Sequence, residues 1–319
     1  MRVFVTRQLP EEALKIVRAA EIEMEVWEGE LPPPPEALRA KVADADGLLC
    51  LLTDRIDAEL LAAAPKLRVV SQMAVGYDNI DIKACAARGI HVGNTPGVLT
   101  ETTADLAFAL LLATARRVLE ADAWLRAGKW QTWSPMELTG PDIHHATLGI
   151  VGLGRIGYEV ARRAHGFQMR ILYAGNNRNE AAERDFGAEL VSLPLLLAES
   201  DFVSLHAPLT PSTRHLFGHN EFGEMKPSAI FINTSRGALV NQAALVEALE
   251  CGWIAGAGLD VFEIEPLPPD DPLLKLPNVV LLPHIGSASV ATRTKMAVLA
   301  AENLVAGLQG QPLRHPVLS

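Results

Sequence analysis

Cysteine is scarce in this chain of 319 residues, and its three cysteines, Cys50, Cys85 and Cys251, lie too far apart in the sequence to form a C-x-x-C pair. Such sparse usage does not fit a disulfide-stapled secreted scaffold or a structural zinc site, and it favours a reducing, cytoplasmic setting. No metal site is predicted for the chain.

Two further features are missing: an excess of positive charge and a long apolar run. The formal net charge of −10 leaves no basic face for a nucleic-acid backbone. The longest apolar run, 106–115, is about half the length of a membrane span, and the short apolar start at 3–6 predicts a first strand rather than a signal peptide. We therefore expect neither a nucleic-acid partner nor a membrane.

What the chain does contain is an alternation of strand-length and helix-length segments, which predicts an α/β fold with parallel sheets. Its length fits two domains better than one core. We predict two doubly wound parallel-sheet domains, a Rossmann-type nucleotide domain at 99–287 inserted into a flavodoxin-like substrate domain at 1–98 and 288–319. The boundary follows the turn cluster Asn94-Thr95-Pro96-Gly97, and a last helix at 290–307 returns to the first domain. Strands are expected at 3–6, 23–27, 47–51, 69–74, 90–93, 148–151, 170–173, 202–206, 229–233, 256–260 and 279–282.

One predicted helix, from Thr100 to about Arg117, is apolar on nearly every face through its middle. A helix of that kind is buried on all sides, and a second subunit is one way to cover it. The sequence therefore predicts a homodimer.

The most informative stretch is Gly152-Leu153-Gly154-Arg155-Ile156-Gly157, a complete G-x-G-x-x-G turn that follows an apolar strand. An amphipathic helix, predicted over 158–170, and a second strand come next. Gly152 permits the tight turn, Gly154 lets the backbone approach a pyrophosphate, and Gly157 lets helix and strand pack closely. With the positive end of the helix dipole, this arrangement predicts a dinucleotide site.

The end of the second strand bears on which dinucleotide is bound. An NAD site usually carries a carboxylate there for the ribose 2′-OH, but this strand ends in Gly175-Asn176-Asn177-Arg178, with no carboxylate before Glu180. An amide donor at Asn176 and a cation at Arg178 favour NADP(H), with NAD(H) as the alternative. The alternative is that this segment is only a polar turn after the strand.

Three polar segments follow other predicted strands, at the sheet edge where ligands bind in open α/β folds. Arg236 follows the strand at 229–233 and could hold a carboxylate through two parallel hydrogen bonds. Asp260 ends the next strand, with Glu265 five residues later. His284 follows the last strand and is suited to donate a proton, with a neighbouring carboxylate stabilising its protonated form.

At this point the chain resembles the D-isomer-specific 2-hydroxyacid dehydrogenase family over essentially its whole length. Within that family it is most similar to the glyoxylate reductase/hydroxypyruvate reductase group, through 74–78, the Trp130-Gln131-Thr132-Trp133 segment and the non-acidic end of the second strand. The segments that carry the resemblance are 74–81, 94–97, the glycine motif, 206–210, 233–237, 258–263 and 283–287.

The resemblance implies NAD(P)H-dependent reduction of a small 2-oxo acid, glyoxylate or hydroxypyruvate, to the D-2-hydroxy acid. His284 is then the proton donor, Glu265 orients it, and Arg236 holds the 2-oxo acid. The residues implied to bind substrate are Leu52, Val75, Gly76, Trp133, Arg236 and His284. The residues predicted to bind the cofactor are Gly152, Leu153, Gly154, Arg155, Ile156, Gly157, Gly175, Asn176, Arg178, Pro208, Thr213, Thr234, Ser235, Asp260 and Gly286.

Some alternatives stay open from sequence. Trp133 matches a tryptophan that reaches into the neighbouring subunit's active site, but it could pack only in the interface. Asn176 replaces an arginine that is common in NADP-using relatives. Another D-2-hydroxyacid dehydrogenase, such as a 3-phosphoglycerate dehydrogenase, and a dinucleotide-sensing corepressor-like binding protein would carry the same motifs.

Overall fold

The chain divides into two compact units, described here from a computed structural model that places residues 1–318. The first unit comprises Met1–Leu99 and the chain from Ser287 onward, and the second comprises Thr100–Gly286. The boundaries expected from sequence, after 98 and after 287, each differ by one residue from those of the compact units.

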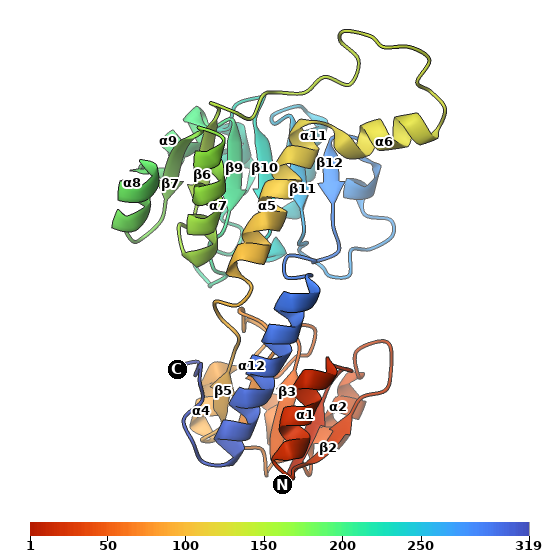
Figure 1. Cartoon of the computed structure of the whole chain (residues 1–319), viewed down its shortest axis with the longest axis vertical. Helices are drawn as coiled ribbons and strands as arrows, with labels where there is room; N and C mark the ends of the chain where they lie inside the picture. Colours follow the sequence, from red (N-terminus) through yellow and green to blue (C-terminus); the bar gives the residue numbers. More distant parts are fainter. Residues whose placement is uncertain (319) are drawn as a thin grey trace. The chain divides into compact units, whose positions relative to one another are not determined.

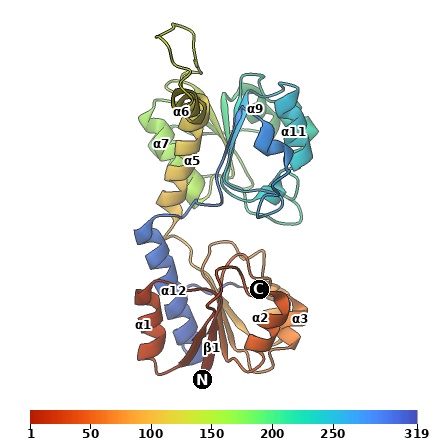
Figure 2. The same ribbon diagram turned by 90° about the vertical axis from the view of Figure 1, so that its right-hand side faces the viewer.

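The first unit is a five-stranded parallel sheet in the order β2-β1-β3-β4-β5, which is the flavodoxin-like order. Helices α1 and α12 pack on one face, and α2, α3 and α4 cover the other (Figure 2). Its strands are β1 (Arg2–Val5), β2 (Glu23–Val26), β3 (Gly47–Cys50), β4 (Val69–Gln72) and β5 (His91–Gly93), and its helices are α1 (Glu11–Ala19), α2 (Pro35–Val42), α3 (Ala58–Ala62), α4 (Ile82–Ala87) and α12 (Val290–Leu308).

The second unit is a seven-stranded parallel sheet in the order β12-β11-β10-β9-β6-β7-β8 (Figure 1). Helices α5 and α7 cover one face, while α9, α10 and α11 cover the other. Its strands are β6 (Thr147–Val151), β7 (Arg170–Ala174), β8 (Glu189–Leu190), β9 (Phe202–Leu205), β10 (Ile230–Asn233), β11 (Gly256–Leu259) and β12 (Val279–Leu281). Its helices are α5 (Thr100–Ala115), α6 (Val118–Arg126), α7 (Arg155–Gly166), α8 (Glu180–Phe186), α9 (Leu193–Glu199), α10 (His219–Gly223) and α11 (Gln242–Glu250), with single turns η1 (Gly237–Leu239) and η2 (Pro272–Lys275).

Helices on both faces of each sheet explain why the central strands are mainly apolar. Every residue of β3, β9 and β10 is buried, as expected for parallel strands that are covered on both sides. The predicted α/β class with two parallel-sheet domains is confirmed.

One local expectation was wrong. The helix after the glycine motif begins at Arg155 rather than Tyr158, because Gly154 takes an extended conformation and serves as the N-cap. Helix α5 lies as an outer layer on the sheet of the second unit and leaves Ala109 exposed. Its burial on all sides would require a second subunit and stays a prediction.

None of the helices within residues 1–318 is both long enough and apolar enough to cross a bilayer.

Candidate active site

The glycine loop between β6 and α7 is tightly packed at two of its glycines and open at a third. Gly152 has a φ of +94°, and a Cβ there would lie 2.6 Å from the Ala207 nitrogen. A Cβ on Gly157 would lie 2.5 Å from the Gly152 oxygen, so both positions require glycine. A Cβ on Gly154, by contrast, would meet nothing within 4 Å.

This open position is also the N-terminus of α7. Among the residues that the structure describes, no side chain caps the helix, so its first N–H groups and the positive end of its dipole are available to an anion. The loop therefore fits the pyrophosphate of a dinucleotide, as the glycine pattern predicted.

The turn after β7 is in contact with a carboxylate of the next helix, a contact that sequence reasoning missed. Glu183, from α8, accepts hydrogen bonds from Arg178 Nε at 2.8 Å and from the Tyr173 hydroxyl at 2.6 Å. These bonds hold the pKa of Glu183 below its usual value. Arg178 is thus paired with Glu183, while Gly175 and Asn176 are exposed beside it. No local pattern indicates this pair, because the contact joins a turn to the middle of a helix.

The same turn is tied to the glycine loop. The Asn179 side chain donates to the Leu153 carbonyl at 3.0 Å, and its other end caps α8 by accepting from the Ala182 N–H. The two predicted cofactor-binding segments therefore form one connected structure.

His284 and Glu265, predicted as a catalytic pair, are in direct contact. His284 Nδ1 lies 2.7 Å from Glu265 Oε2, and 27% of each side chain is exposed. The other oxygen, Glu265 Oε1, accepts from the Phe262 N–H at 3.0 Å. With Nδ1 engaged, Nε2 is the ring nitrogen left to exchange a proton with a ligand.

Burial by itself would raise the pKa of Glu265. The hydrogen bond and charge of His284, the Phe262 N–H and the charge of Arg236 together outweigh burial and hold this pKa below 4.5. Glu265 is therefore ionised at neutral pH, and its negative charge stabilises an imidazolium at His284.

The lowered pKa of Glu265 predicts a pH-dependent effect on stability. Glu265→Gln is expected to lower the melting temperature at neutral pH, because the ionised carboxylate's contribution is present above its unfolded-state pKa. The difference from wild type should shrink as the pH falls below 4.5 and the native carboxylate protonates. Thermal melts of both proteins between neutral pH and about pH 3.5 measure it, and a difference independent of pH would contradict the assigned charge.

Asp260 shapes the loop that carries His284. Its two carboxylate oxygens accept from the N–H groups of Ile285 and Gly286, each at 2.7 Å, and the residue is fully buried. His284 itself has a φ of +54°, a conformation that few non-glycine residues adopt. Burial raises the pKa of Asp260, although these bonds and the charge of His284 oppose it. The predicted contact between Asp260 and the cofactor stays a prediction.

The Arg236 loop follows β10, the strand next to β11. Asn233 organises it: its side chain accepts from Ser235 N–H at 3.0 Å and donates to the Arg236 carbonyl at 3.0 Å. The next residue, Gly237, packs so closely on the Phe262–Glu263 backbone that a Cβ would lie 1.8 Å from the Phe262 carbonyl. The loops of Arg236 and Glu265 are therefore in contact.

Like the open glycine loop, the side chain of Thr234 bears on whether the site fits a cofactor. Its hydroxyl oxygen is buried and has no hydrogen-bond partner within the part of the chain that the structure describes. Such a buried orphan group is rare in native proteins unless a ligand or water completes it. It lies at the carboxyl end of β10, where a dinucleotide bound to the glycine loop would extend.

The loop after β9 supplies the remaining cofactor candidates. The Thr213 hydroxyl donates to the Pro208 carbonyl at 2.7 Å and accepts from the Thr210 N–H at 2.8 Å, which gives the loop one shape. His206 precedes this loop in the sequence. Burial lowers its pKa to about 4, and His206 is therefore neutral at physiological pH.

In the first unit, the segment at Val75 and Gly76, which the resemblance implied to bind substrate, presents two N–H groups. Those of Val75 and Gly76 have no acceptor within residues 1–318, and both residues are half-buried. Paired N–H groups of this kind suit a carboxylate, which only accepts hydrogen bonds.

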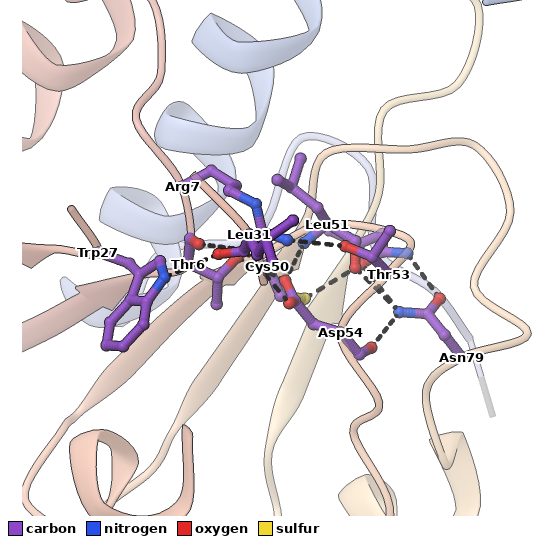
Figure 3. A network of polar contacts seen from close by, with 10 residues as sticks. Thr6, Arg7, Trp27, Leu31, Cys50, Leu51, Thr53, Asp54 and Asn79 are labelled. Carbon is purple, nitrogen blue, oxygen red and sulfur yellow. Dashed lines mark hydrogen bonds and ion pairs between the residues drawn. The ribbon is translucent and has the colours of Figure 1, made fainter. Parts of the chain in front are cut away.

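Leu52 lies in a neighbouring loop of the same unit, after β3, and its side chain is 38% exposed. Figure 3 shows how this loop is held: buried Asp54 accepts from the Thr6 hydroxyl and from the Leu51 N–H, and Asn79 donates to the Leu51 and Asp54 carbonyls. Trp133, predicted to act across a dimer, lies in the loop after α6 and is 77% exposed.

Comparisons with known proteins show which family the chain belongs to. A sequence profile described as "D-isomer specific 2-hydroxyacid dehydrogenase, NAD binding domain" matches residues 108–286. The chain belongs to the D-isomer-specific 2-hydroxyacid dehydrogenase family and is an NAD(P)-dependent enzyme of that class, as the sequence predicted.

Among its curated relatives is the glyoxylate reductase of Korarchaeum cryptofilum, which is 59% identical over 311 residues, 97% of this chain and 93% of the relative. Among solved structures, the TT0316 protein of Thermus thermophilus has a TM-score of 0.94 and 49% identity, with all of both chains covered. The NADPH-dependent glyoxylate/hydroxypyruvate reductase of Sinorhizobium meliloti, in complex with NADP and malonate, has a TM-score of 0.86 and 37% identity over 99% of this chain and 96% of that one.

Proposed function

We propose that the protein reduces glyoxylate and hydroxypyruvate to the corresponding D-2-hydroxy acids with a reduced nicotinamide dinucleotide, in the cytoplasm. The observation that carries this proposal is the His284–Glu265 pair, 2.7 Å apart, in a loop cluster that also includes Arg236. A proton donor, a carboxylate that stabilises its charged form and a guanidinium are the groups that carbonyl reduction of a 2-oxo acid requires. The names of the curated relatives support the same substrate class.

Each group has a defined task in this proposal. Arg236 binds the 2-oxo acid and polarises its carbonyl oxygen. The N–H groups of Val75 and Gly76 bind the substrate carboxylate. His284 Nε2 donates a proton to the oxygen that becomes the hydroxyl, and Glu265 stabilises the imidazolium before transfer. The residues of the glycine loop, the turn at 175–178, the loop at 208–213 and Thr234 hold the dinucleotide, which supplies the hydride when bound.

The cofactor preference we propose is for NADPH over NADH. The turn at 175–178 carries no carboxylate of its own, and its last residue, Arg178, supplies a guanidinium. A 2′-phosphate would have to share Arg178 with Glu183, so we expect a moderate preference rather than strict selection.

The experiment that tests both parts is the loss of reduced-nicotinamide absorbance with glyoxylate or hydroxypyruvate, with NADPH and NADH in parallel. We expect fast oxidation, a higher kcat/KM for NADPH, and a loss of about tenfold in that preference in Arg178→Ala. Higher kcat/KM with NADH would keep the enzyme class and overturn the cofactor proposal. Cofactor binding without oxidation by any 2-oxo acid would instead favour the dinucleotide-sensing alternative.

We also propose that the protein is a homodimer through α6 and the loop that follows it. No residue of α6 is buried, and Val118 and Leu125 are 50% and 55% exposed. These two residues are seven apart and so share one face of the helix. In the following loop Trp130, Trp133 and Met136 are also exposed. An apolar surface of this kind marks an interaction site, and a second copy would also cover the open side of α5.

The double variant Val118→Glu/Leu125→Glu is expected to run as a monomer in size-exclusion chromatography with light scattering, because charges on that face cannot be buried without cost. Leu31→Glu, at an exposed leucine of the first unit, is the control and should leave the dimer intact. If Trp133 completes the neighbouring site, the monomer also loses activity. A fully active monomer would limit Trp133 to packing in the interface.

A further inference from the structure

Hydrogen bonds to the carbonyls of the same two peptide units fix the direction in which the Val75 and Gly76 N–H groups point. A peptide unit is planar and trans, so its N–H points opposite to its C=O. The unit that carries the Gly76 N–H has the Val75 carbonyl at its other edge, and that carbonyl accepts a hydrogen bond from Asn94 Nδ2 at 2.8 Å.

The neighbouring peptide units are held in the same way. The Ala74 carbonyl, on the unit that carries the Val75 N–H, accepts from the Thr95 N–H at 2.9 Å. The Gly76 carbonyl accepts from Gln72 Nε2 at 3.3 Å. Three successive carbonyls are thus bound by the protein, and the two N–H groups between them are left for a ligand.

Asn94 is itself held firmly. Only 8% of it is exposed. Its carbonyl accepts from the Asn303 side chain on α12 at 3.0 Å, and its N–H donates to the His315 carbonyl at 3.2 Å. Asn303 is fully buried and also accepts from the His315 N–H. Hydrogen bonds to the last helix and to the segment after it therefore hold Asn94 in place.

We infer that Asn94 is a positioning residue for substrate: it turns the Gly76 N–H toward the substrate carboxylate by binding the Val75 carbonyl behind it. The sequence placed Asn94 only in a turn at the domain boundary. This inference rests on the proposed function, because it takes the Val75 and Gly76 N–H groups as the carboxylate site. A side chain that never touches substrate then contributes to substrate affinity.

The test uses Asn94→Ala and Asn94→Leu, the second of which keeps most of the side-chain volume if the first folds poorly. Without the amide, the peptide unit is free to rotate and one hydrogen bond to a charged group is lost. We expect the KM for glyoxylate, and the dissociation constant of the unreactive analogue oxamate, to rise about tenfold. The kcat should stay within about threefold of wild type, because the lost interaction is made equally in ground and transition states.

Ser71→Ala is the matched control. Ser71 is buried in the same unit and its hydroxyl donates to the Ala300 carbonyl at 2.7 Å, so this variant also loses a buried bond from a side chain to a carbonyl. It should lower the melting temperature without changing the KM for glyoxylate. NADPH binding should be unchanged in all three variants.

The outcomes separate this inference from the proposed function. A wild type that reduces glyoxylate, with Asn94 variants whose KM and oxamate affinity match it, overturns the positioning role and leaves the function intact. A wild type that binds oxamate without reducing glyoxylate overturns the function, while weaker oxamate binding in the Asn94 variants would still support the inference. A wild type that neither reduces glyoxylate nor binds oxamate overturns both.

Discussion

His284→Ala is expected to lower kcat by about 10²- to 10⁴-fold, while the dissociation constant for NADPH stays close to that of wild type. The substitution removes the proton donor and leaves Glu265 without its partner at 2.7 Å. The dinucleotide candidates at the glycine loop are separate from this side chain, and the loop's shape depends on Gly152 and Gly157. Steady-state kinetics with glyoxylate, together with fluorescence titration of NADPH, give both quantities.

His219→Ala serves as the matched control for His284. His219 is also paired with a glutamate, Glu247, at 2.8 Å, but this pair joins α10 to α11 and both side chains are about half exposed. Its loss should leave kcat unchanged. If His284→Ala abolished NADPH binding instead of turnover, or if both variants lost the same activity, the role of proton donor would be refuted.

The second large effect is expected from Gly237→Ala, the addition of one methyl group. A Cβ at this position would lie 1.8 Å from the carbonyl carbon and oxygen of Phe262 and 2.4 Å from the Glu263 nitrogen. These are backbone atoms, which cannot rotate away as a side chain could. We expect a loss of about 3 kcal/mol or more of folding free energy, and a fall in melting temperature of roughly 6–12 °C for a unit of this size.

Activity should fall with stability in Gly237→Ala, because the clash separates the loops of Arg236 and Glu265. Gly223→Ala is the control, since a Cβ there meets nothing within 4 Å and the residue lies in α10. That change is expected to be neutral or to stabilise by up to about 1 kcal/mol. Calorimetry and circular dichroism give the melting temperatures of the two variants for comparison. A Gly237→Ala protein that melts like wild type would show that the two loops are not tightly packed.

The architecture could be predicted because its signals are local. Strands such as β9 and β10 are buried on both faces and stand out as mainly apolar segments, and the glycine motif indicates the backbone shape directly. Strand β8 could not be found, because Glu189 and Leu190 are both exposed and no apolar run marks them. The start of α7 was misplaced because a glycine N-cap contributes no side-chain signal.

The site was predictable to the extent that its residues follow strands. Arg236, Glu265 and His284 could be expected to gather because parallel strands end at one edge of the sheet. What sequence could not reveal is which groups they engage. The bonds from Asp260 to the His284 loop, from Arg178 to Glu183 and from Asn94 to Val75 join residues through backbone atoms or across elements. Such contacts leave no periodicity in the chain.

The path of the chain also sets an order of events during synthesis. The first unit is completed by α12, which packs on β3, β4 and β5 and whose Asn303 holds Asn94. These residues leave the ribosome only after all of Thr100–Gly286, a delay on the order of ten seconds or more at typical elongation rates. The inserted unit therefore has its whole sequence available first. Until α12 emerges, the nascent first sheet exposes the part of that face which α1 does not cover, and this interval is when a chaperone would have the most apolar surface to bind.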